Sequence, residues 1–195
     1  MAPSAKGPRL FPLMLATMAS QALLVVFSPT IAAIADEFGV SVGAVGQARS
    51  ITAVVAIAAS LSVATRTDVI GVRRLLAVGA ALAIAACGVV SAAPGLPVFL
   101  GAHVLVGLGF ACLLSAGFAG VAAFDAERRA WAIGYVAGAN ALAWIVVNPV
   151  VGTLTDSVSW RVSQAVPALL ALGALLAARS AATVPGAHVA PRLWA

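Results

Sequence analysis

The sequence predicts an all-α membrane protein in which six helices cross the bilayer. Hydrophobic residues make up 63% of the chain and charged residues only 9%, and the mean hydropathy is +1.10. A soluble domain of this length does not need so much apolar material for a single core. The apolar residues form six runs, in which only Arg49 and His103 have side chains that can be charged near neutral pH. A buried, soluble helical protein is therefore the weaker interpretation.

Each run is long enough to cross the bilayer as a helix, which takes about 20 apolar residues, and the longer runs fit by tilting. In chain order the runs cover residues 10–35, 42–64, 75–93, 97–123, 130–154 and 162–178. The sixth is the shortest and contains Ser163, Gln164 and Pro167, so it lies near the lower limit of length. Small residues are abundant and aromatic residues make up only 6%, which predicts closely packed helices rather than barrel strands.

Short loops join the runs, so residues 10–178 are expected to form one bundle of antiparallel neighbours. If the chain crosses six times, one side holds Lys6, Arg9, Arg66, Arg73, Arg74, Arg128, Arg129, Arg179 and Arg192, and the other side holds Arg161. The positive-inside rule then places both termini in the cytoplasm of a multi-pass protein in a cell membrane, of the bacterial inner or plasma membrane type. The net charge of +5 is thus a topology signal, and we do not expect nucleic acid as a partner.

The two ends of the chain are expected to lie in the cytoplasm outside the bundle. Residues 1–9 are read as a short N-terminus rather than the start of a cleaved signal, because the following apolar run is too long for a signal core. Residues 179–195 contain Pro and Gly with little periodicity, so we expect a disordered or surface-associated tail.

The loop between the second and third runs contains Asp68, Gly71, Arg73 and Arg74. An acid at a helix end can accept charge-assisted hydrogen bonds from arginine or from a neighbouring helix N-terminus, and glycine permits a tight turn before the basic residues. One interpretation is a gating loop that latches one conformation. The other is a solvated turn that only sets topology.

This loop resembles the cytoplasmic signature of the major facilitator superfamily, G-x-x-x-D-R-x-G-R-R. Asp68, Gly71 and Arg73 match that pattern, whereas Ala64 stands at the position of its first glycine. The resemblance implies half of a major facilitator fold, with its six helices arranged as two inverted three-helix repeats.

A weak internal repeat agrees with that implication. A shift of 88 residues places Asp68 on Asp156 and Arg73 on Arg161, after the second and fifth runs. Those two positions lie on opposite faces of the predicted membrane protein, as two units of inverted topology require.

The fifth run contains Gly134 and Gly138, followed by Asn148, Pro149 and Gly152. Proline removes a helix hydrogen bond and small residues allow close approach, so a kinked and closely packed segment is expected. The second group resembles the fifth-helix pattern of the superfamily that is associated with antiporters, with Pro149 and Gly152 matching. An ordinary proline kink without a role in gating is the alternative.

The fourth run contains Phe99, His103, Gly107 and Gly109 at a spacing similar to the superfamily pattern L-x-x-x-R-x-x-x-G-x-G. His103 stands in place of an arginine that is implicated in proton transfer in the family. Histidine can also carry a proton near working pH, although it lacks the permanent charge of arginine. His103 is therefore either a proton-coupling residue or a neutral residue that is hydrogen-bonded between helices.

Helical rise places Arg49 and His103 about 10 Å below the outer boundary of the membrane. An arginine at that depth either extends its head group to the interface or faces a polar cavity. Gln21 and Asn140 lie nearer to mid-depth, where they either line a cavity or form hydrogen bonds between helices. In the superfamily the helices of runs one, two, four and five line the cavity. The resemblance therefore implies Gln21, Arg49, His103 and Asn140 as the substrate or proton pathway.

The resemblance implies a secondary transporter for efflux of a small solute or drug, with proton coupling as its expected energy source. The first run has no acidic residue, unlike many exporters of cationic drugs, so a neutral or anionic solute is favoured over a cation. The sequence has no cluster with metal-site spacing, no nucleophile-and-base arrangement and no phosphate-binding loop. We expect neither enzymatic activity nor a cofactor or a metal.

The superfamily normally has twelve spans in two halves, and the interface of the halves forms the substrate path. The predicted bundle is one such half. Either a second six-helix half pairs with it, as another polypeptide or in a homodimer, or the chain is a truncated transporter or accessory membrane subunit that transports nothing alone. The expected partners are a small-molecule solute, the lipid bilayer and that second half.

Overall fold

The computed structural model describes residues 9–181 of the chain. Residues 1–8 and 182–195, which include most of the predicted tail, lie outside the described residues, and so does the side chain of Asp68. Throughout the described part all regular secondary structure is helical, and six helices are long and apolar enough to cross a membrane. The predicted all-α fold of six spans is confirmed.

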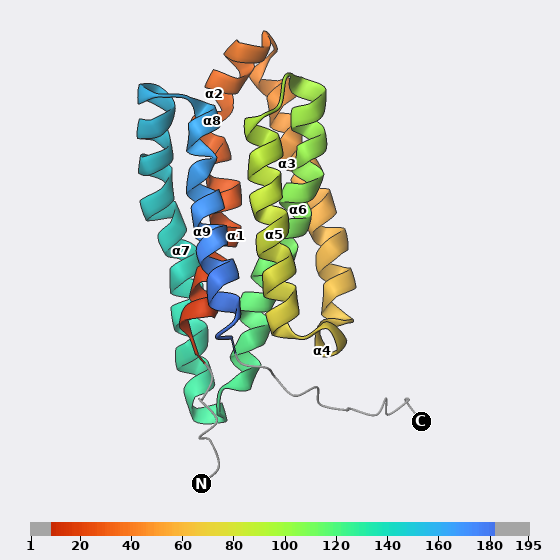
Figure 1. Ribbon diagram of the computed structural model, residues 1–195, viewed down its shortest axis with the longest axis vertical. Helices are drawn as coiled ribbons and strands as arrows, with labels where there is room; N and C mark the ends of the chain where they lie inside the picture. The colour runs from red at the N-terminus through yellow and green to blue at the C-terminus, as the bar shows by residue number, and fades with distance from the viewer. Residues whose placement is uncertain (1–8, 182–195) are drawn as a thin grey trace.

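Each predicted run coincides with one span of the structure (Figure 1). In order, the spans are α1 (Phe11–Val25) with α2 (Phe27–Phe38), α3 (Val42–Ala64), α5 (Val72–Ser91), α6 (Leu96–Ala119) with the 3-10 turn η1 (Gly120–Ala123), α7 (Ala126–Ser157), and α8 (Trp160–Ser163) with α9 (Ala165–Ala178). The short helix α4 (Thr67–Ile70) lies in the loop after the second span.

Local sequence explains where the first two spans break and turn. Pro29 has no amide hydrogen to donate to the carbonyl four residues earlier, and the first span is interrupted at Val26, between α1 and α2. Gly39 ends α2 in the left-handed region, with φ 64° and ψ 35°. Ser41 then caps α3, because its side chain accepts a hydrogen bond from the backbone N–H of Ala44 at 3.1 Å.

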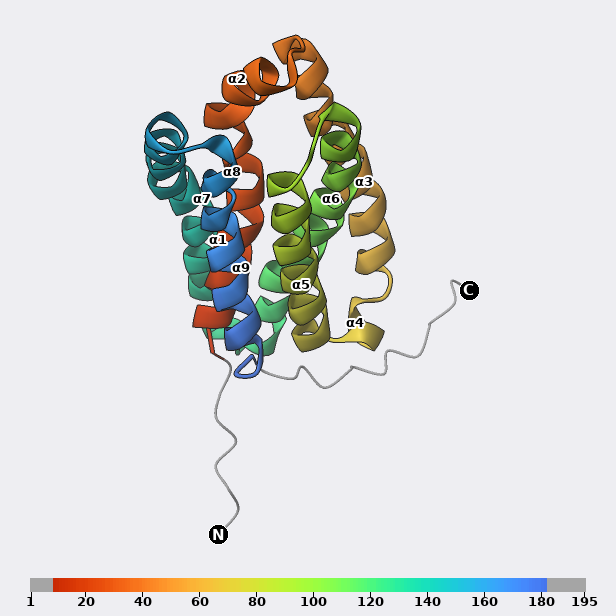
Figure 2. The same cartoon turned by 45° about the horizontal axis from the view of Figure 1, so that its top comes forward.

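The packing of the helices repeats itself when the first three spans are exchanged with the last three. α3 packs on α6 as α7 packs on α1, and α5 packs on α6 as α9 packs on α1. Two further contacts, α1 with α6 and α5 with α9, map onto themselves. Figures 1 and 2 show α3 and α7 at opposite edges of the bundle. Because the exchanged spans run in opposite directions, the bundle consists of two inverted three-helix repeats.

Small residues allow the helices to approach closely. A Cβ atom built on Gly79 of α5 would lie 2.8 Å from Cβ of Cys112 and 2.9 Å from the backbone nitrogen of Leu113, both in α6. Gly109 of α6 makes a similar close approach to α5, because a Cβ atom built on it would lie 3.0 Å from the backbone nitrogen of Ala83. Without a hydrophobic driving force between helices in lipid, such close van der Waals packing is a main source of association.

The two edge helices are the least buried of the six. Only 22% of the apolar window of α3 and 28% of that of α7 are buried within the bundle. Their exposed side chains include Ile57 and Leu61 on α3 and Ile145 on α7. These apolar surfaces fit an environment of lipid or of another membrane-embedded protein.

We expect the Gly79→Ala variant to be less stable than the parent protein, because the added methyl group meets the backbone of α6. Overpacking of this kind costs about 1–3 kcal/mol. Thermal melting of the purified protein in detergent, followed by size-exclusion chromatography, measures the change. The matched control is Gly88→Ala in the same helix, where an added Cβ has no neighbour within 4 Å. Equal melting temperatures for the two variants would contradict the close α5–α6 contact.

Candidate functional site

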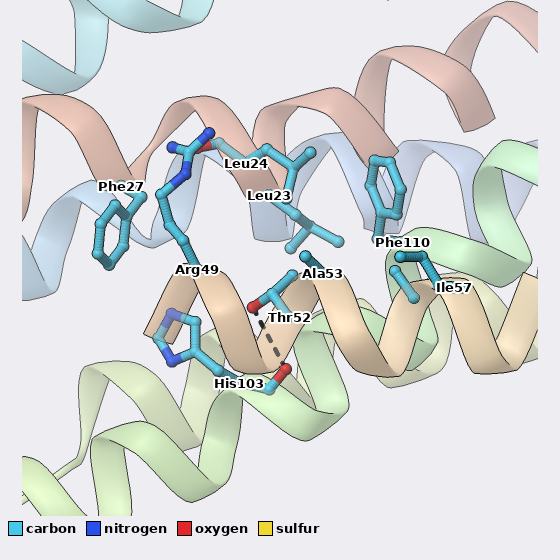
Figure 3. Close-up of a pocket in the computed structure, with 10 residues that line it drawn as sticks. Leu23, Leu24, Phe27, Arg49, Thr52, Ala53, Ile57, His103 and Phe110 are labelled. Atoms are coloured by element: carbon cyan, nitrogen blue, oxygen red, sulfur yellow. Dashed lines mark hydrogen bonds between the residues drawn. The ribbon is translucent and has the colours of Figure 1, made fainter. Parts of the chain in front are cut away.

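A cavity of about 280 Å³ lies between α1, α3 and α6. We call it the central cavity. Its polar lining consists of Arg49 and Thr52 from α3 and His103 from α6, and the rest of its wall is apolar. Figure 3 shows Arg49, Phe27 and His103 at one end of the cavity and Ile57 and Phe110 at the other. The cavity therefore has a polar end and an apolar end.

Arg49 reaches from α3 across the polar end of the cavity towards α1 (Figure 3). Its Nη1 atom donates a long hydrogen bond of 3.4 Å to the carbonyl of Leu24, and its Cζ atom lies 5.6 Å from the centre of the Phe27 ring. Both partners stand next to the break between α1 and α2. The guanidinium thus contacts a backbone carbonyl and the face of an aromatic ring, which are weak substitutes for a carboxylate.

His103 is buried, with only 7% of its surface exposed. Its Nδ1 atom lies 2.8 Å from the carbonyl oxygen of Phe99. Because a carbonyl can only accept, Nδ1 is the donor, and the ring presents Nε2 as its free nitrogen. The backbone is also held, since the Thr52 hydroxyl donates to the carbonyl of His103 at 3.4 Å. The imidazole ring is thus oriented by a carbonyl of its own helix, and the backbone that carries it is bonded to α3.

The two amides predicted for the same pathway lie elsewhere. Asn140 of α7 donates through Nδ2 to the carbonyl of Thr17 in α1 at 3.5 Å. Next to it, the Thr17 hydroxyl donates to the carbonyl of Val136 at 3.1 Å. Gln21 is half-buried on α1 and is not part of the central cavity wall. The structure therefore brings Arg49 and His103 together, whereas Asn140 joins two helices.

The glycines of the fifth span border a second hollow. Gly134 and Gly138 of α7, with Trp131, Tyr135 and Met14, line an apolar groove of about 440 Å³ between α1 and α7. A Cβ atom built on either glycine has no neighbour within 4 Å. Within the described bundle this face of α7 is thus open rather than packed against a helix.

The second group of residues in the fifth span lies near the far end of α7. The helix continues through Pro149, whose carbonyl accepts a hydrogen bond of 3.0 Å from the Thr153 hydroxyl. Asn148 is exposed, and a Cβ on Gly152 would lie 3.9 Å from Pro29 of α2. This segment therefore borders the broken part of the first span.

The loop between α3 and α5, which contains the predicted latch, requires a glycine at one position. Gly71 has φ 79° and ψ 141°, a region that other residues rarely adopt, so glycine is needed to connect α4 to α5. Arg73 and Arg74 follow in the first turn of α5 and are exposed. The Asp68 side chain lies outside the described residues, so its partner stays a prediction.

Comparison with known families identifies the bundle. Residues 13–192 match the model of the Major Facilitator Superfamily, a stretch that includes nearly all of the described helices. The chain belongs to the major facilitator superfamily. Members of the superfamily are transporters rather than enzymes, so this facilitator is a multi-pass membrane transporter. No curated protein sequence matches it.

Sequence reasoning missed a polar cluster at the end of the facilitator opposite the start of α1 and the end of α9. Arg161 of α8 donates from Nη2 to Glu37 Oε1 at 2.7 Å and from Nε to the same oxygen at 3.1 Å. It also donates to the carbonyls of Ser91 and Ala93, at the end of α5 and just after it. We call this cluster the outer brace. It ties the ends of the first, third and sixth spans together.

The outer brace continues into the central cavity through aromatic rings. Trp160 donates from Nε1 to Glu37, and its ring lies 6.1 Å from the ring of Phe99. The Phe99 ring is 4.5 Å from the ring of His103, which meets the Phe27 ring edge-on at 6.0 Å. Edge-to-face aromatic pairs favour fixed geometries. These ring contacts connect the outer brace with His103 and Phe27 at the polar end of the cavity.

The Glu37→Gln variant is expected to lower the melting temperature of the facilitator, because it removes the charge that accepts three donated hydrogen bonds. The carboxylate is partly exposed, so we expect a loss of about 1 kcal/mol. The control is Asp36→Asn, which removes a neighbouring exposed charge without touching the brace. A variant that melts like the parent protein would show that the charge of Glu37 contributes nothing to stability.

Proposed function

We propose that this facilitator is a proton-coupled secondary transporter that exports a small solute through the central cavity. The observation that supports it best is that Arg49 and His103 both lie at one end of a cavity whose wall is apolar apart from them and Thr52. Ionisable residues inside a membrane are costly, and they usually mark substrate, ion or proton pathways. Export is supported by the resemblance of the fifth span to a pattern of antiporters.

His103 is the candidate for proton coupling. Its Nδ1–H stays bound to the Phe99 carbonyl, so Nε2 can gain and lose a proton without any change of ring orientation. The added proton would bring a second positive charge to the end of the cavity where Arg49 lies. The charge on His103 then links the protonation of this residue to the affinity of the cavity for a polar solute.

A second six-helix half, either another polypeptide or a copy of this chain, would complete the substrate path. The apolar edges of α3 and α7 offer the surface for it, since they flank the cavity side of the bundle and are the least buried spans. A membrane subunit that transports nothing alone is the alternative function, and it predicts no flux by the purified protein.

The orientation follows from the charges of the described loops. Arg66, Arg73, Arg74, Arg128, Arg129 and Arg179 belong to loops or helix ends on the side where the chain enters α1 and leaves α9, and Arg161 lies at the opposite end (Figure 1). By the positive-inside rule the termini are cytoplasmic and the outer brace faces away from the cytoplasm of a cell membrane.

Proteoliposomes with a trapped pH-sensitive dye test the proposed activity. Addition of anionic, neutral and cationic solutes one at a time should reveal at least one that moves protons, and the sign of the pH change distinguishes exchange from co-transport. His103→Asn should abolish solute-linked proton movement, because the asparagine amide can replace Nδ1–H but cannot titrate. No solute-dependent signal beyond that of empty vesicles would favour the accessory subunit.

The predicted gating loop has its own test in the same vesicles. Asp68→Asn should slow solute flux while insertion and yield stay normal, because the amide loses the charge that latches one conformation. Asp125→Asn is the matched control, since Asp125 is an exposed acid at the same end of the bundle but outside the loop. Unchanged flux in the Asp68 variant would leave the loop as a topology-setting turn.

A further inference from the structure

The central cavity carries an unbalanced positive charge. Of the carboxylates whose side chains the structure describes, Glu37 is paired with Arg161, and none forms an ion pair with Arg49. Arginine has five N–H donors in a planar fork, and Arg49 makes a single hydrogen bond of 3.4 Å within the described residues. The side chain of Arg49 is exposed, so its remaining N–H donors are accessible to a solute, and a guanidinium binds anionic groups through charge-assisted hydrogen bonds. The polar end of the cavity is therefore suited to an anion.

The geometry of the fork favours a planar anionic head group. A guanidinium can bind a carboxylate through two parallel N–H···O bonds, and such bonds are among the strongest hydrogen bonds in proteins. The Phe27 ring lies on one side of the guanidinium and limits its orientation. Nε2 of His103 borders the same end of the cavity, from α6.

The remainder of the cavity suits an apolar body. Ala53, Ile57 and Phe110 extend the wall away from Arg49 (Figure 3). Ile57 follows Arg49 by just over two helical turns, so the cavity is about 12 Å long from its charged end to its apolar end. Its volume of about 280 Å³ is near the lower limit for small-molecule sites, which span roughly 300 to 1,000 Å³. A compact ligand fits this volume.

We propose that the central cavity binds an amphipathic organic monoanion, whose carboxylate-like head is held by Arg49 and whose apolar body lies against Ala53, Ile57 and Phe110. The inference rests on the proposed transport function and names its substrate class. A cation is repelled by Arg49, and a neutral solute leaves the guanidinium without a counter-charge. A dianion such as phosphate would bring a second charge and no apolar surface to a wall that is mostly apolar.

Equilibrium binding tests this substrate class apart from transport. The full-length protein is placed in nanodiscs of uncharged phosphatidylcholine, and binding of tritium-labelled 4-phenylbutyrate is measured by scintillation proximity. We expect saturable binding that excess 4-phenylbutyrate displaces. The amide of the same acid, phenylbutyltrimethylammonium and inorganic phosphate should not displace it. Equal displacement by the amide would overturn the requirement for an anion.

Variants connect the binding to the named residues. Arg49→Met should weaken binding about ten-fold or more, which corresponds to the loss of a charge-assisted hydrogen bond. Arg128→Met removes the same charge from the exposed end of α7 and should leave the affinity unchanged. Ala53→Phe keeps every charge and should block binding by filling the apolar part. Full affinity in the Arg49 variant would refute the proposal.

The carboxylate could come from a water-soluble acid or from a fatty acid of the membrane. Unlabelled oleate in the same nanodiscs distinguishes these sources, since displacement at lower concentration than by 4-phenylbutyrate assigns the membrane source. The flux assay separates the two proposals. An acid that binds but is not carried disproves transport and keeps the ligand class, whereas flux of a cation or neutral solute without binding of the acid disproves the class alone.

Discussion

Glycine contacts hold α6, the helix that carries His103, close to α3, α5 and α1. A Cβ on Gly107 would lie 2.8 Å from the carbonyl of Thr52 and 2.9 Å from Cβ of Val55, so α3 and α6 touch through their backbones at that level. Gly109 does the same against α5, and Gly117 meets the side chain of Thr17 in α1. The helix that carries His103 is thereby pressed against three others, and interactions of this kind replace the hydrophobic effect inside a bilayer.

The central cavity lies about one helical turn away from these contacts. Where α3 touches α6 at Gly107, Thr52 bonds to the carbonyl of His103, and the cavity lies between these two helices and α1. On the side of α1, Arg49 donates to the carbonyl of Leu24, close to the interruption of the first span at Val26. The polar end of the cavity thus lies between a close helix contact and that interruption. No separate domain is needed to form the site.

Much of the fold could be predicted from the sequence because membrane crossing imposes a length and a composition on each helix. Arg49 and His103 were also identifiable, since ionisable residues within apolar runs are rare. The positions of Gln21 and Asn140 around their helices were not, because depth in the membrane does not determine which neighbour a side chain faces. Thr52 could have been predicted as well, because it stands three residues after Arg49 on the same helix face. The partnership of Glu37 with Arg161 joins residues that are far apart in sequence, and the charge of Glu37 alone gave no sign of it.

The two repeats share an architecture but not their terminal interactions. Were the repeats identical, exchanging their conformations would produce a state of equal energy that opens to the other side. In this chain Arg161 has four acceptor contacts at its end of the bundle, while Arg73, its counterpart in the internal repeat, is exposed. Similarly, α3 borders a cavity with a cation, whereas its counterpart α7 borders an apolar groove. Because these interactions differ, an exchange of conformations between the two repeats would not give a state of equal energy.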